Sequence, residues 1–89
     1  MNAAMVYGAH RKVVRNLKRR KVGDRQYEII DKKTGEVVAS AACTGEPGRD
    51  DYPWDVVLTE DGAPSIGAQP TLTQCIDMVA THILGKDLR

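Results

Sequence analysis

Seven positively charged side chains lie within eleven residues near the start of the chain, and their chemistry suits a phosphate backbone. They are Arg11, Lys12, Arg15, Lys18, Arg19, Arg20 and Lys21. Residues three and four apart share one face of a helix, so on a helix this spacing places the cations in a row. Such a row can lie along a nucleic-acid backbone and release counterions, with about five to seven phosphate contacts and a strong dependence on salt. We therefore predict sequence-tolerant binding of DNA or RNA by these residues.

The charge of the chain is divided unequally along its length. Residues 1–25 carry eight cations and one anion, a net charge of +7, whereas the other 64 residues carry five cations and eleven anions, a net charge of −6. This asymmetry indicates an anionic partner or mutual neutralisation of the two parts. The alternatives to nucleic acid are a solvated helix face whose apolar side covers the core, pairing with acidic groups of the chain or of another copy, and an acidic partner protein.

The other side chains capable of chemistry are scattered. Two of each zinc-ligand type are present, but they occur singly, without the short paired spacings of a zinc finger; they are His10, His82, Cys43 and Cys75. The carboxylates of residues 46–51 do not have the spacing of a calcium loop, and no phosphate loop or nucleophile elbow occurs. We expect no metal, no cofactor and no enzymatic activity. A disulfide or metal role for the cysteines is less consistent with their apolar surroundings than a buried, reduced state.

Two aromatic residues suggest an alternative function. Tyr52 and Trp54 flank Pro53 beside a loop rich in Gly and Asp. We expect Trp54 to be the central core residue beneath the last helix. If it is exposed instead, it forms with Tyr52 an anchor for a protein partner, because aromatic residues dominate interface energetics. The alternative is therefore a protein–protein interaction module that modulates a host protein.

The first predicted element is a basic amphipathic helix within residues 1–23. Asn2 is its candidate N-cap, and Gly23 can close it. The helical spacing of apolar positions is formed by Ala3, Val6, Tyr7, His10, Val14 and Leu17. The pattern is clearest over residues 9–21, so we expect one helix to carry all seven cations.

Residues 24–89 are predicted to form a sheet followed by a helix. Strands are expected at 25–31, 36–43 and 52–59, with a short fourth strand at 63–68. Asp31 and Gly35 bound a hairpin. Thr71 and Gln74 form a capping box that opens the last helix, which we expect to end at Gly85. The chain therefore predicts a single α+β domain, in the order α-β-β-β(-β)-α, with an antiparallel three- or four-stranded sheet and the C-terminal helix on one face.

Several of these residues are shared with known small proteins. Tyr27 begins a strand, Asp31 and Gly35 bound a hairpin, Trp54 lies in a later strand, and Thr71 caps the last helix. In these features, with the Gly turn at residues 61–62, the chain resembles small sheet-plus-helix units found in short proteins of actinobacteria and their phages. The resemblance covers Tyr27 to Leu84 and implies a phage or actinobacterial accessory protein of unassigned role.

Two nucleic-acid-binding families have related layouts. The element order is similar to that of a double-stranded RNA-binding domain, but residues 69–74, at the start of the last helix, hold none of the Lys residues with which that family spans phosphates. The sheet is also similar to the arm-binding sheets of phage integrases. Carboxylates at its surface would repel phosphate there, namely Glu28, Glu36, Asp55 and Glu60. We therefore expect the basic segment, and not the sheet face, to contact nucleic acid.

Length and hydropathy suggest where the protein acts and in what form. No run of about 18 apolar residues occurs, as a membrane-spanning helix would need, and the first residues lack the apolar stretch and cleavage site of a secretory signal. We expect a cytoplasmic protein with no membrane partner, in the host cytoplasm if a phage encodes it. A chain of 89 residues with few large aromatic side chains gains stability by self-association, so we expect a homodimer.

Overall fold

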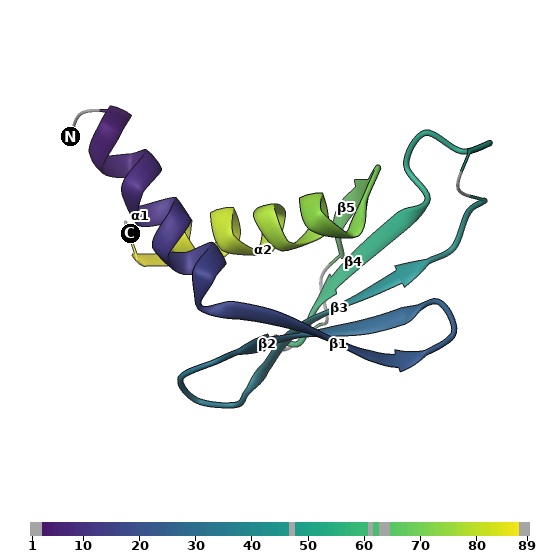
Figure 1. Ribbon diagram of the computed structural model, residues 1–89, viewed down its shortest axis with the longest axis horizontal. Coiled ribbons are helices and arrows are strands. Elements are labelled where there is room, and N and C mark those ends of the chain that lie inside the picture. Colours follow the sequence, from purple (N-terminus) through teal and green to yellow (C-terminus); the bar gives the residue numbers. More distant parts are fainter. Residues whose placement is uncertain (1–2, 47, 61, 63–64, 88–89) are drawn as a thin grey trace.

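The computed structural model describes residues 3–46, 48–60, 62 and 65–87, with side chains described between residues 8 and 85 of these ranges. Its elements, in chain order, are α1 (Ala3–Arg15), β1 (Leu17–Gly23), β2 (Gln26–Asp31), β3 (Val37–Cys43), β4 (Trp54–Leu58), β5 (Ser65–Gln69) and α2 (Leu72–Asp87). The strands form one antiparallel sheet in which each pairs with the next along the chain, and α2 lies over one face (Figure 1). The predicted α+β class and the position of the C-terminal helix are confirmed.

The first helix is shorter than predicted. α1 ends at Arg15, and Leu17–Gly23 forms strand β1, so the expectations of a helix over residues 9–21 and of a helical segment 1–23 were wrong in their second half. β1 pairs with β2 along its whole length, from Leu17 opposite Asp31 to Gly23 opposite Gln26. Lys and Arg are good helix formers, but tertiary pairing overrides such weak preferences.

α1 stops at Arg15, where its last turn contacts the hairpin that joins β2 to β3. The backbone N–H of Asn16 donates to the carbonyl groups of Lys12 and Val13, at 3.2 and 3.1 Å. Lys32 donates from Nζ to the carbonyl oxygen of Arg15, at 2.7 Å, and from its backbone N–H to that of Asn16, at 2.8 Å. These donors satisfy carbonyl groups that a helix end leaves without partners, and a cation there also suits the helix dipole.

The core lies between the sheet and α2. Strand residues at alternate positions point toward the helices, and the largest fully buried side chains are Ile29, Val56, Val79 and Cys75. Small residues in β3, Ala39 and Ala41, complete the buried cluster together with Leu17, Leu58 and Ala80. The core is therefore mainly aliphatic, as the shortage of aromatic residues requires.

The predicted hairpin and fourth strand are confirmed, with adjusted bounds. In the hairpin, the N–H of Gly35 donates to the carbonyl of Asp31 at 2.8 Å, and Gly35 has a φ of +74°, which favours glycine. The fourth predicted strand is β5, Ser65–Gln69; residues 63–64 lie outside the described part of the chain. Because β1 precedes the four predicted strands, the sheet has five strands.

α2 begins as predicted but ends later. The hydroxyl of Thr71 accepts a hydrogen bond from the N–H of Gln74 at 3.2 Å, which confirms the N-cap. The predicted end at Gly85 was wrong, because the helix continues to Asp87. α2 packs against α1, and we infer that this packing offsets the cost of about 1 kcal/mol of a Gly within a helix.

α1 is held mainly by α2. Val13 and Val14 pack on the core cluster, and His10 Nε2 donates to the carbonyl oxygen of Asp77 in α2 at 3.3 Å. Beyond these contacts α1 projects past the sheet (Figure 1). The side chains of Val6 and Tyr7, predicted for its apolar face, lie outside the described side chains.

Candidate nucleic-acid interface

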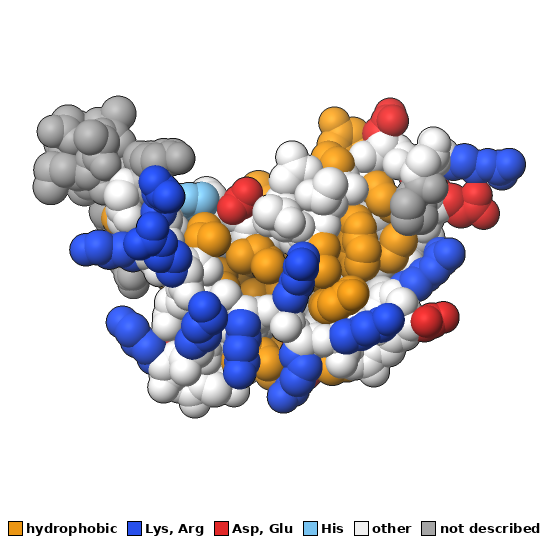
Figure 2. All heavy atoms as spheres, in the orientation of Figure 1, with side chains coloured by type: hydrophobic (Ala, Val, Ile, Leu, Met, Phe, Trp, Pro, Cys, Tyr) orange, Lys and Arg blue, Asp and Glu red, His pale blue; other side chains and the backbone are white. Residues whose placement is uncertain are grey.

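The seven predicted cations form a continuous strip along two elements. We define the basic strip as Arg11, Lys12 and Arg15 of α1 with Lys18, Arg19, Arg20 and Lys21 of β1. All seven residues are exposed, and Lys and Arg side chains gather along α1 and β1 in Figure 2. The structure therefore places the predicted site residues next to one another, on a helix end and an edge strand.

The prediction that these cations share one helical face was wrong. Successive side chains of a strand point to opposite faces, and Leu17 faces the core. Arg19 and Lys21 therefore lie on the helix side of the sheet, and Lys18 and Arg20 lie on the outer side. Because β1 is an edge strand, both sets border the same open edge.

Most of the strip is not neutralised within the described part of the chain. Arg20 forms an ion pair with Glu28, the residue directly opposite it on β2, and Arg11 has an intramolecular contact. The strip residues whose side chains form no ion pair with a described residue are Lys12, Arg15, Lys18, Arg19 and Lys21. Clustered charges of one sign attract mobile anions, so this surface favours a polyanionic ligand.

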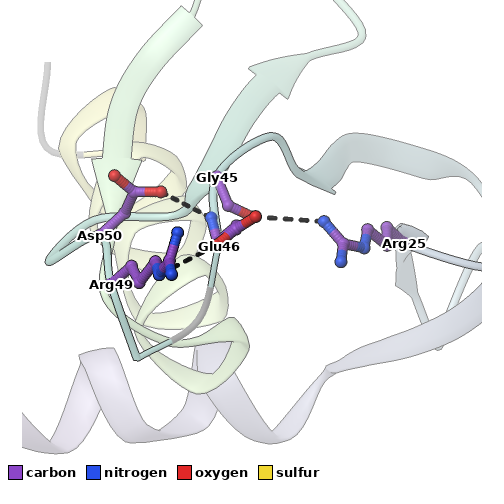
Figure 3. Close-up of polar contacts among 5 residues, drawn as sticks. All are labelled: Arg25, Gly45, Glu46, Arg49 and Asp50. Carbon is purple, nitrogen blue, oxygen red and sulfur yellow. Dashed lines mark hydrogen bonds and ion pairs between the residues drawn. The ribbon is translucent and has the colours of Figure 1, made fainter.

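The acidic loop between β3 and β4 is organised by its own contacts (Figure 3). The N–H of Glu46 donates to Asp50 Oδ2 at 2.6 Å, and Arg49 Nε lies 3.5 Å from Glu46 Oε2. A Cβ at Gly45 would lie 2.7 Å from Asp50 Oδ2, so a larger residue there would displace the Asp50 carboxylate. Arg25 reaches the loop through the carbonyl oxygen of Gly45, at 3.4 Å, and its side chain forms no ion pair with a described residue.

A pocket of about 290 Å³ adjoins the strip where α1 meets the hairpin, and Lys12, Asn16, Asp31 and Lys33 are among its lining residues. The Asp31 carboxylate accepts hydrogen bonds from Asn16 Nδ2 at 2.9 Å and from the N–H of Lys33 at 2.8 Å. These bonds hold the pKa of Asp31 below its ordinary value, and the bond from Asn16 contributes most. Asp31 is therefore a fixed anion that joins α1 to the hairpin.

The aromatic residues lie at the rim of the core. The rings of Tyr27 and Trp54 meet edge to face, with centroids 5.9 Å apart and an interplanar angle of 61°. Trp54 is half-buried, so the prediction of a central core position is corrected: Val56 and Leu58 occupy the centre. Tyr52 is 62% exposed, as a protein-binding anchor requires.

The cysteine and histidine residues are separately engaged. Cys43 and Cys75 are free and buried, as predicted, and burial raises the pKa of the Cys75 thiol to about 11. His82 Nε2 lies 2.9 Å from Glu60 Oε1. Within the described ranges, no three His, Cys, Asp or Glu side chains are grouped so that they could hold a metal ion.

Sequence reasoning missed strand β1, and with it the contact of Tyr27 with Trp54 and the hydrogen bond from Asn16 to Asp31. The signal that could have revealed β1 is the Gly23–Asp24 pair between two β-compatible runs, which is typical of a short hairpin. Once that hairpin is recognised, Lys21 falls opposite Tyr27.

The arrangement defines an α+β protein with a five-stranded antiparallel sheet and a basic edge. The chain matches no protein-family model, no curated protein and no solved structure. In the described residues, no helix combines the length and the apolar character needed to cross a membrane.

Proposed function

We propose that this protein binds nucleic acid through the basic strip. The observation that carries the proposal is the continuous row of exposed cations, five of which form no ion pair with a described residue. Phosphate contacts of this kind give affinity without reading the sequence. The opposite charge of the remaining chain keeps the contact confined to α1 and β1.

The geometry suits a ligand that follows the edge of the sheet. A strand rises about 3.3 Å per residue, so Lys18 to Lys21 extend along roughly 10 Å, and the last turn of α1 continues the row. Because Arg20 is already paired with Glu28 and Arg11 has an intramolecular contact, five of the seven cations are left, and we expect about five phosphate contacts. The logarithm of the binding constant should then fall with the logarithm of the salt concentration with a slope of about −3.5 for single strands and about −4.5 for duplex.

The test is fluorescence anisotropy of labelled oligonucleotides over a range of salt concentrations. Lys18→Glu, Arg19→Glu and Lys21→Glu should each weaken binding at least about 5- to 8-fold at roughly 0.1 M salt and make the salt slope shallower by about 0.7–0.9. Arg49→Glu is the matched control, because it makes the same change in charge at a side chain that is 83% exposed and lies in the β3–β4 loop.

The outcomes separate clearly. The proposal fails if the wild-type protein binds neither single strands nor duplex at about 0.05 M salt, where phosphate contacts are strongest. Equal losses in Arg49→Glu and in the strip variants would also contradict it, because net charge alone would then account for binding.

A protein partner is the second candidate function, and the exposure of Tyr52 favours it. A tyrosine that is 62% exposed and lies two residues from Trp54 resembles the aromatic anchors that carry interface energy. Capture from nuclease-treated lysate, compared between the wild-type protein and Tyr52→Ala, tests this alternative. A stoichiometric partner that is lost in Tyr52→Ala supports it, and an unchanged set of bound proteins contradicts it. Light scattering of the same samples tests the predicted homodimer.

A further inference from the structure

The helices leave part of the sheet uncovered. α2 packs over β3, β4 and β5, while α1 contacts α2 and β1. The helix-side face therefore lacks a cover over the later residues of β1 and the neighbouring residues of β2. In Figure 2, apolar side chains are visible at the surface between α2 and the row of Lys and Arg side chains on β1.

Strand register identifies the residues at this opening. Lys21 lies directly opposite Tyr27, and Arg19 lies directly opposite Ile29. Tyr27 in turn faces Ala41 on β3, whose small side chain lets Tyr27 approach Trp54 on β4. Tyr27 and Trp54 are both half-buried, so two aromatic rings border a surface that also carries two cations with no ion pair to a described residue.

From this juxtaposition we propose that the ligand is single-stranded nucleic acid, with bases stacked on Tyr27 and Trp54 and phosphates contacting Arg19 and Lys21. The inference rests on the proposed function and specifies its ligand. Aromatic platforms beside cations are the means by which proteins bind single strands without sequence preference. Duplex bases are already stacked on one another and gain nothing from the rings.

The surrounding charges limit the path that a bound nucleic-acid strand can take. Glu28 lies on the outer side of the sheet, paired with Arg20, so it does not face the aromatic pair. The carboxylates of the β3–β4 loop lie beyond Cys43, where the carbonyl of Pro53 accepts from the N–H of Thr44 at 2.8 Å. Phosphates are repelled by these loop carboxylates, so the nucleic-acid strand runs from the two rings along β1 toward α1.

The test uses Trp54, which is the only tryptophan of the chain and therefore a specific fluorescence reporter. The full chain is titrated with oligothymidine of about 12 nucleotides, within the range of known single-strand sites, and with a duplex of equal length. We expect saturable quenching of Trp54 by the single strand, and at least roughly 10-fold weaker binding of the duplex because stacking is lost.

Variants test whether the aromatic rings cause the preference for single strands. Tyr27→Leu should weaken single-strand binding about 5- to 150-fold, the loss expected for one stacked base, with little effect on duplex binding. Tyr52→Leu is the control, because it removes an exposed tyrosine near Trp54 and should leave both affinities unchanged. If Tyr27→Leu unfolds, as thermal melting followed by circular dichroism would show, the quenching and single-strand preference of the wild-type protein decide the question.

The results distinguish this inference from the proposed function. Equal binding of single strands and duplex without quenching of Trp54 overturns the inference and leaves the proposed function in place. Absence of binding by either nucleic acid at low salt overturns both. Quenching with a preference for single strands supports both.

Discussion

The two edges of the sheet lie in contrasting surroundings. β5 has five residues and no charged side chain, and the chain continues from it almost directly into α2, which packs on it. β1 has seven residues, four consecutive cations and an exposed surface from Lys18 to Val22. An unpaired strand edge can recruit other chains, and proteins limit this by short strands, bulges, covering elements or charge. β5 is short, has a register shift against β4 and is covered by α2. β1 is longer and is limited mainly by charge, with a register shift between Lys21 and Gly23 near its end.

Protection of the sheet edge explains only part of the basic strip. Charges on β1 prevent two such edges from pairing, because like charges opposite one another are destabilising. Arg11, Lys12 and Arg15 lie on α1, where there is no strand edge to protect. The strip continues past the edge, so edge protection explains only the part on β1, whereas the anionic ligand that we propose would account for both parts.

The largest expected effect tests whether the buried core beneath the helices stabilises the fold more than the exposed part of β1 does. Ile29 is completely buried, whereas Val22 is 52% exposed. Ile29→Ala should lower the free energy of unfolding by about 2–5 kcal/mol, because it leaves a cavity, and Val22→Ala should change it by less than about 0.5 kcal/mol. Urea denaturation followed by circular dichroism measures both. Similar losses for the two variants would contradict this division of the molecule.

The same division explains which parts of the fold were predictable. β2, β3, β4 and α2 bury one face, so their apolar residues alternate at the spacing of a strand or helix, and their existence was predicted within a few residues. β1 buries only Leu17. Its identity depends on pairing with β2, a long-range contribution that local periodicity does not contain.

The candidate site was predictable in composition and not in geometry. The seven cations are conspicuous in the sequence and were named correctly as neighbours. Their directions depend on whether residues 17–23 form helix or strand, so the single cationic face was wrong. Tyr27 became a site candidate only when the register placed it opposite Lys21.

A smaller effect should show that the side covered by α2 excludes water. The pKa of Cys75 is raised from 9.0 to about 11 by burial and then by the nearby Asp55 carboxylate. The folded state therefore retains the thiol proton more tightly than the unfolded state. This contribution is complete below pH 9.0 and is lost as the pH rises toward about 11, by up to about 2–3 kcal/mol.

Cys75→Ala isolates this contribution from other groups that titrate in alkali. The stability difference between the wild-type protein and Cys75→Ala, measured by urea denaturation at about pH 8 and again near pH 10.5, should shift in favour of the variant at the higher pH. A constant difference would mean that the thiol is not desolvated and that α2 covers the sheet less tightly than its buried residues indicate.

The smallest expected effect concerns the ion pair on the open side. Arg20 and Glu28 face each other on the outer surface, with side chains 59% and 27% exposed. Because exposed ion pairs contribute little, a double-mutant cycle should give an interaction energy of about 0.2–1 kcal/mol. A coupling of several kcal/mol would show that this side of β1 is not the solvated margin that the comparison of edges describes.

The ion pair also allows the basic strip to be strengthened. Glu28→Gln removes the carboxylate that holds Arg20, which makes one further cation available to phosphate. Nucleic-acid affinity should then rise about 5- to 8-fold at roughly 0.1 M salt, with a steeper salt slope. Glu36→Gln is the matched control, because it removes the same charge from an exposed residue of the β2–β3 hairpin. An equal gain in both variants would attribute the effect to net charge, whereas a gain confined to Glu28→Gln places the bound phosphate beside β1.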